Sequence, residues 1–183
     1  MFLSVRRAPR VRLPGDQQRE LGTAYADLRD ALGAQGDSAG ALRNYTDALA
    51  IAEDLVAADA KNTLWQEGLA TSHTDLASAL EAQGDLEGAL GHYRNALSVD
   101  ERLAASDPYN ARWQQSAAGS HNSVGVVLNA QGDFDGALRR YRAALGIVQA
   151  LVQDDPGNQE LDKALSELRE RVNSTREAQQ QAS

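Results

Sequence analysis

The sequence contains no cysteine, and this absence excludes a disulfide framework, a cysteine-ligated metal site and a thiol nucleophile. It also has no apolar run of about 18 residues or more, so no membrane-spanning helix is expected. The net charge of −8 argues against an extended nucleic-acid-binding face, because phosphate recognition needs clustered lysine and arginine. What is present, 42% hydrophobic and 24% charged residues, predicts a folded, soluble chain.

Positive charge is concentrated at the N-terminus of this acidic chain. Residues 1–13 carry four arginines, Arg6, Arg7, Arg10 and Arg12. We predict a basic, disordered arm here, either a frayed terminus without a role or a segment that touches an acidic partner or the acidic body of the same chain. The arginines are not followed by the apolar stretch of a secretory signal. We therefore expect a cytoplasmic protein, and the excess of arginine over lysine suggests a GC-rich bacterial coding sequence.

The sequence repeats itself with a period of 48 residues. The tetrapeptide Ala-Gln-Gly-Asp occurs at 34–37, 82–85 and 130–133. Residues 62–109 share 21 of 48 positions with 110–157, and 14–61 share 21 with 62–109. Such self-similarity is the signature of a repeat architecture. We predict a single repeat domain over 14–178, with units 14–61, 62–109 and 110–157, a capping helix at 158–178 and a frayed tail at 179–183.

Each unit has the pattern of two helices joined by a tight turn. In the second unit, apolar residues recur at helical spacing over 63–82 and again over 86–105. Between them, Gly84 suits the left-handed residue that ends a helix and Asp85 suits the N-cap of the next. We expect the small residues Gly40, Gly88 and Gly136 to let helices approach. Stacking such hairpins buries a continuous core, so the predicted fold is an all-α solenoid.

The repeats resemble the tetratricopeptide repeat (TPR) family. The signature positions of that family are matched in register in all three units. In the third unit they are His121, Val124, Gly125, Leu128, Gly132, Ala137, Tyr141 and Ala144. The period of 48 exceeds the 34 residues of the ordinary family repeat. In this respect the sequence resembles the long-helix variant of the repeat found in bacterial proteins and kinesin light chains. The resemblance implies a right-handed solenoid of three helix-turn-helix repeats with a C-terminal capping helix.

The resemblance also implies a function and a site. Tetratricopeptide-like arrays are non-catalytic interaction modules whose first helices line a concave groove that binds a peptide or helix. Register places five small polar residues in that groove: Thr71, Thr74, Ser78, Asn122 and Asn129. Because none of the positions assigned to the groove by register holds lysine or arginine, a clamp for a partner's C-terminal carboxylate is disfavoured. A neutral or basic partner segment is preferred over an acidic one.

Other chemistry has weak support in the sequence. His73 and His121 lie one repeat apart, which favours packing over shared metal ligation. Trp65 and Trp113 are also 48 apart and either form an aromatic platform for a ligand or, the interpretation we favour, fill the junctions between units. No nucleophile or phosphate-binding motif is present, so we expect no enzyme, no cofactor and no metal. We expect a monomer or weak homo-oligomer. Two alternative functions stay open: a self-assembling structural scaffold, and a regulatory segment of a larger signalling protein.

Overall fold

The computed structural model describes residues 38–182 of the chain, and these residues form six α-helices and no strand. The helices are α2 (Ser38–Ala58), α3 (Thr63–Ala82), α4 (Leu86–Ser106), α5 (Ala111–Ala130), α6 (Phe134–Asp154) and α7 (Gln159–Gln181). The predicted arm at 1–13 and the first helix of the first unit lie outside the described residues. The all-α repeat fold expected from the sequence is confirmed.

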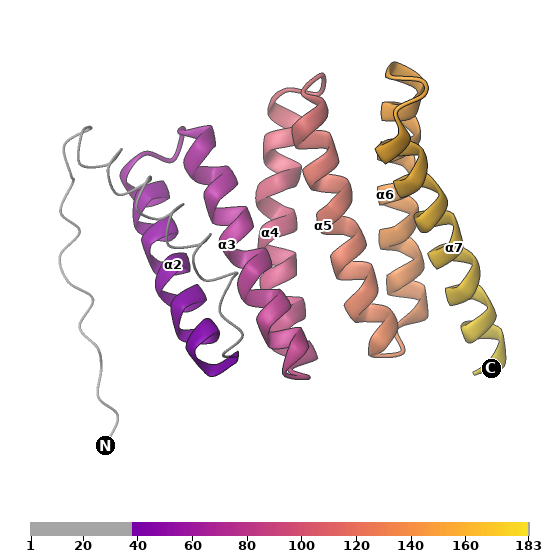
Figure 1. Cartoon of the computed structure of the whole chain (residues 1–183), viewed down its shortest axis with the longest axis horizontal. Coiled ribbons are helices and arrows are strands. Elements are labelled where there is room, and N and C mark those ends of the chain that lie inside the picture. Colours follow the sequence, from indigo (N-terminus) through magenta and orange to yellow (C-terminus); the bar gives the residue numbers. More distant parts are fainter. Residues whose placement is uncertain (1–37, 183) are drawn as a thin grey trace.

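The helices stand side by side in chain order, and each packs mainly against its neighbours in sequence (Figure 1). The pairs α3–α4 and α5–α6 fall within the predicted units 62–109 and 110–157. The helix α7 continues to Gln181, three residues beyond the predicted end at 178. In Figure 1, α5 and α7 lie in front of α4 and α6, so the first helices of successive repeats share one face.

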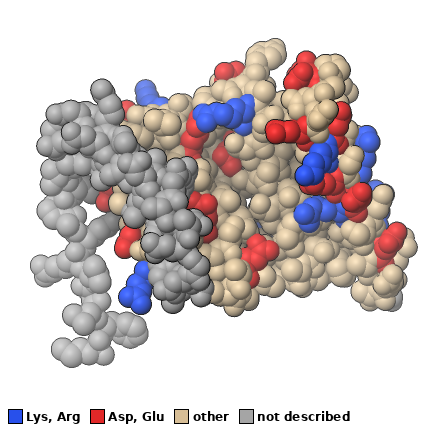
Figure 2. Space-filling view, in the orientation of Figure 1, with Lys and Arg blue, Asp and Glu red and all other residues tan. Residues whose placement is uncertain are grey.

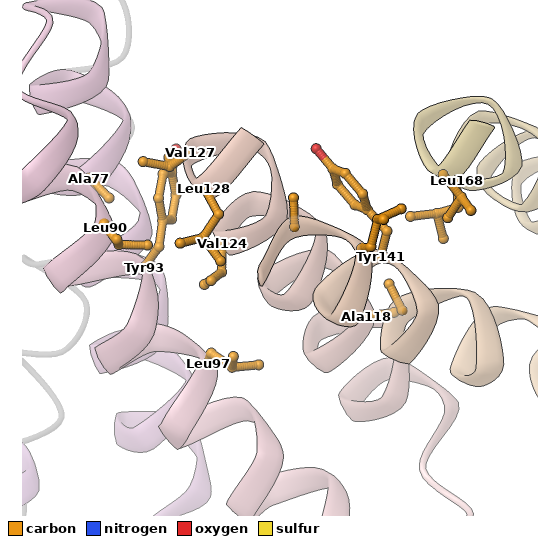
Figure 3. Close-up of a cluster of buried hydrophobic side chains, with 14 of the residues drawn as sticks. Ala77, Leu90, Tyr93, Leu97, Ala118, Val124, Val127, Leu128, Tyr141 and Leu168 are labelled. Atoms are coloured by element: carbon orange, nitrogen blue, oxygen red, sulfur yellow. The ribbon is translucent and has the colours of Figure 1, made fainter. Parts of the chain in front are cut away.

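One hydrophobic cluster runs from α3 to α7 and holds the repeats together. Tyr141 of α6, only 2% exposed, is among the largest side chains that are fully enclosed. Figure 3 shows Tyr93 beside Val127 and Leu128, and Tyr141 one repeat farther along, toward Leu168. Equivalent tyrosines therefore fill equivalent positions, and burial of a shared apolar surface is what stabilises the stack.

The predicted turns are confirmed. Gly84 and Gly132 have φ angles of 83° and 80°, in the left-handed region that glycine adopts without steric cost. Asp85 accepts from the amide of Gly88 at 2.9 Å, and Asp133 accepts from the amide of Gly136 at 2.8 Å. Each aspartate thus satisfies a free amide at the start of a helix.

The reason expected for two glycines is wrong. Gly88 and Gly136 were expected to let neighbouring helices approach. A Cβ atom at either position would instead overlap the capping carboxylate of Asp85 or Asp133. The glycines therefore make room for the N-cap side chains, and the periodic Asp-x-x-Gly is one capping unit.

Replacing Asp133 by alanine is expected to lower the free energy of unfolding by about 0.5–2 kcal/mol, because the amide of Gly136 loses its acceptor. Urea denaturation followed by circular dichroism measures the change. Asp133→Asn is the control, since asparagine caps helices as well as aspartate does. An equal loss in both variants would show that the carboxylate acts through something other than the cap.

Candidate functional site

A groove lies between the first helices α3 and α5, with a cavity volume of about 420 Å³. We call it the α3–α5 groove. Its lining residues are Glu67, Ala70, Thr71 and Thr74 of α3, Asp100 of α4, and Arg112, Ser116, Gly119, Ser120, Asn122 and Ser123 of α5. Most of these side chains are small and polar, so the groove offers hydrogen-bonding groups rather than an apolar floor.

Glu67 joins the two repeats at one end of the groove. Its carboxylate accepts from the indole Nε1 of Trp113 at 2.6 Å and forms an ion pair with Arg112. Trp113 is partly buried and packs on the cluster formed by Ala70, Val99 and Leu103. This is the junction packing that we favoured from the sequence, with the indole edge bonded across the repeat boundary.

Asp100 is the most unusual residue of the groove. Its side chain is only 6% exposed and accepts from the hydroxyl of Ser120 at 2.6 Å. Burial raises the pKa of Asp100; the hydrogen bond from Ser120 opposes this shift, and the negative charge of Glu67 adds to it. The positions 48 residues before and after hold Ala52 and Val148, both buried apolar residues. A carboxylate therefore stands at a position that the neighbouring repeats fill with a buried apolar side chain.

A second groove, of about 250 Å³, adjoins the first between α5 and α7. We call it the α5–α7 groove. Val148, Leu161 and Leu168 contribute apolar surface to it. Gly119 and Asn122 line both grooves. A Cβ atom at Gly119 would meet nothing within 4 Å, so the space above this residue, which both grooves share, is open.

Figure 2 shows this first-helix face in the orientation of Figure 1. Acidic atoms form small, separate patches over its middle, with a basic patch beside them near the top, and acidic and basic atoms are also mixed over the α6–α7 end. In the α3–α5 groove, Glu67 and Asp100 carry negative charge, and Arg112 already pairs with Glu67. The electrostatic character of the groove is therefore set by Asp100.

The structure brings together three of the five residues predicted for the groove. Thr71, Thr74 and Asn122 line the α3–α5 groove, and the two threonine hydroxyls donate to the backbone carbonyls four residues earlier, each at 3.0 Å. Their hydroxyl oxygens keep lone pairs for a ligand. The side-chain Oδ1 of Asn122 is enclosed and has no partner among the described residues.

Ser78 and Asn129 line neither groove. The hydroxyl of Ser78 lies 2.9 Å from the hydroxyl of Tyr93, which donates to Glu81 at 2.9 Å. Asn129 stands one repeat after Glu81 in register, and its Oδ1 is enclosed without a partner among the described residues. Both residues therefore belong to the hairpin ends rather than to the shared grooves.

The histidines pack between helices. His73 Nδ1 lies 3.1 Å from His92 Nδ1, and His121 Nε2 lies 3.3 Å from Glu101. Burial and the neighbouring His92 lower the pKa of His73 to about 4. Over residues 38–182 no three histidine, cysteine or acidic side chains gather as metal ligands would, and no helix is long and apolar enough to span a bilayer.

Comparison with known proteins gives a family match. The sequence profile described as "Tetratricopeptide repeat" matches residues 69–107 and 118–156. No curated protein matches the chain.

The solved structures that are similar to the chain include the following three. The crystal structure of BtubC (BKLC) from P. vanneervenii has a TM-score of 0.46 and 20% identity, covering 91% of this chain and 74% of that one. PcrH from Pseudomonas aeruginosa has a TM-score of 0.45 and 18% identity, covering 95% and 98%. The de novo designed helical repeat protein DHR64 has a TM-score of 0.37 and 15% identity, covering 91% and 96%.

Proposed function

We propose, from the premise that this chain is a tetratricopeptide-repeat protein, that it is a non-catalytic module that binds a peptide or helix of a protein partner. Such repeats generally mediate protein–protein interaction. The binding surface that we propose is the α3–α5 groove with the adjoining α5–α7 groove, including Thr71, Thr74 and Asn122. With it we propose a cytoplasmic location and a monomer or weak homo-oligomer, as the sequence predicts.

Gly119 is the observation that carries this proposal. A glycine inside a helix is less favourable than alanine by about 1 kcal/mol, and this one makes no close packing contact that a Cβ atom would disturb. Its effect is to keep the floor open where the two grooves meet. A partner backbone lying there approaches α5 closely, with the polar groups of one groove on one side and apolar surface on the other.

The test places a large side chain at Gly119, on the surface shared by the two grooves. A display library of random linear peptides is selected on the full chain, and the affinities of selected peptides are measured by fluorescence anisotropy. We expect Gly119→Trp to weaken binding by about tenfold or more, because the indole occupies the space that both grooves share. The matched control is Gly91→Trp on α4, where a Cβ atom also meets nothing within 4 Å and the residue lines neither groove.

Two outcomes would contradict the proposal. One is a library that yields no peptide bound by the wild-type chain. The other is a Gly119→Trp variant that keeps its helical circular dichroism and binds the selected peptides as tightly as Gly91→Trp does. If sedimentation then shows concentration-dependent association of the wild-type chain that Gly119→Trp abolishes, the grooves serve self-assembly instead.

A further inference from the structure

We propose that the α3–α5 groove selects its partner through a cationic side chain, an arginine or a lysine, whose charged group pairs with the carboxylate of Asp100. This inference rests on the proposed function and names the chemistry of the partner: a protein segment with a basic residue that enters the groove. It follows from four observations on Asp100 and its surroundings.

The first observation is the repeat register. Asp100 follows Val99 within the apolar stripe of α4, and the equivalent positions in the units before and after hold Ala52 and Val148. Ser120 is its only hydrogen-bond partner among the described residues. A buried carboxylate with a single neutral donor costs stability, and packing does not require it where alanine and valine serve the same position.

The second observation is that one oxygen of Asp100 has no hydrogen-bond donor among the described residues. Ser120 donates to Oδ2, while Oδ1 accepts no hydrogen bond from the described residues. Over those residues, the fully enclosed side-chain atoms without a partner are His121 Nδ1, Asn122 Oδ1 and Asn129 Oδ1. Oδ1 of Asp100 is not one of these enclosed atoms, so it keeps some accessible surface, and Asp100 is a lining residue of the α3–α5 groove.

The third observation is the balance of charge around the groove. Glu67 on α3 and Asp100 on α4 are its acidic residues, and Arg112 on α5 is its basic residue. Arg112 is engaged with Glu67 and its side chain is 68% exposed, so it does not neutralise Asp100. Within the described residues, Asp100 therefore has no cationic partner, and one incoming positive charge balances the groove.

The fourth observation is the shape of the path to Asp100. Ala70, Thr71 and Thr74 line the groove on the α3 side. On the α5 side, Gly119 has no side chain that projects into the groove. A lysine or arginine has a long apolar stem and a charged end, so it places its charge deep while its stem covers methyl groups along the way. An aspartate or glutamate lacks this reach and meets the negative charges of the groove, which disfavours acidic segments.

The experiment uses the peptides selected from the random library on the wild-type chain. We expect them to share one arginine or lysine, and its replacement by norleucine to weaken binding by about tenfold or more. Asp100→Ala is expected to weaken binding of the parent peptide by a similar factor. It should not weaken the norleucine peptide further, so a double-mutant cycle identifies the pair.

Folding of the variant and the effect of overall charge are both controlled. Asp100→Ala reproduces the residue found at Ala52, and the freed hydroxyl of Ser120 has its own helix as acceptor, as Ser72 has when it donates to Gly68 at 2.7 Å. Glu177→Gln removes one negative charge from an exposed site on α7 that lines neither groove. We expect it to change the affinity by less than about twofold, since screened surface charges contribute little.

The results separate this inference from the proposed function. Selected peptides that bind tightly, lose binding in Gly119→Trp, and respond equally to Asp100→Ala and Glu177→Gln would overturn the cationic pairing while leaving the groove as the binding site. Selected peptides without a common basic residue would overturn it as well. A library with no wild-type binder would overturn both. A tenfold loss confined to Asp100→Ala and to the basic residue of the peptide would establish the pair.

Discussion

Replacing Tyr141 by alanine is expected to lower the free energy of unfolding by about 3–5 kcal/mol, the usual cost of deleting a buried large aromatic side chain. Tyr141 is 2% exposed and belongs to the cluster that joins α3 to α7. Its ring also lies against Gly125, where a Cβ atom would come within 2.6 Å of the ring carbon Cε1. The cavity would open between α5 and α6, and the glycine contributes no side chain to fill it.

Tyr109 provides the matched control for this loss. It is 97% exposed in the turn before α5, so Tyr109→Ala is expected to change the free energy of unfolding by no more than about 0.5 kcal/mol. Urea denaturation of both variants, followed by far-ultraviolet circular dichroism, makes the comparison. Equal midpoints for Tyr141→Ala and the wild-type chain would mean that the cluster does not hold the repeats together as the structure indicates.

The fold was predictable because the residues that begin and end the helices repeat with the same period as their apolar stripes. The helix predicted at 63–82 is α3 with the same bounds, since Asn62 caps its start and Gly84 follows its end. The helix predicted to end at residue 105 continues to Ser106, where the chain turns before Pro108. A helix end that depends on a side-chain cap or a left-handed glycine can be predicted from the residue types at that end. The last residue of a helix without such a feature can be predicted only to within one or two residues.

The candidate site was predictable only in part. Thr71, Thr74 and Asn122 were assigned to the groove and line it, because they lie on the parts of the first helices that face each other. Ser78 lies one turn after Thr74, and there the hydroxyl of Tyr93 reaches it. Helical spacing gives the face of a helix, but it does not say which side chain from the neighbouring helix covers each turn.

Asp100 was missed for a different reason. It lies on the second helix of its unit, whose apolar stripe predicts core, whereas the family resemblance places the groove on first helices. The signal was present in the register, since an aspartate stands between Ala52 and Val148 at positions that are otherwise apolar. In a repeat protein, the residue that departs from its equivalents is the informative one, because the repeats themselves show what packing requires.

Acidification from pH 7 to about pH 4 is expected to remove about 3 kcal/mol of stability through His73 alone. Its pKa is lowered from 6.5 to about 4 in the folded chain, first by burial and then by the positive charge of His92. Between these values the unfolded chain binds the proton and the folded chain does not, so stability falls as the pH falls. This contribution to stability is fully present above pH 6.5 and is lost progressively as the pH falls from 6.5 to the folded pKa of about 4. Each unit of difference between the two pKa values corresponds to about 1.4 kcal/mol.

His73→Tyr isolates this contribution, because tyrosine is the residue that the first repeat carries at the equivalent position 25 and it does not titrate in this range. The measurement is the free energy of unfolding in urea at several pH values for both chains, and the quantity of interest is their difference. His121, whose pKa burial also lowers, contributes to both chains and largely cancels. His92 contacts His73, so the difference between the two chains also includes any change in the protonation of His92. A difference that stays constant from pH 7 to pH 4 would show that His73 accepts a proton in the folded chain as readily as in the unfolded one. The ring would then be open to water rather than packed between α3 and α4.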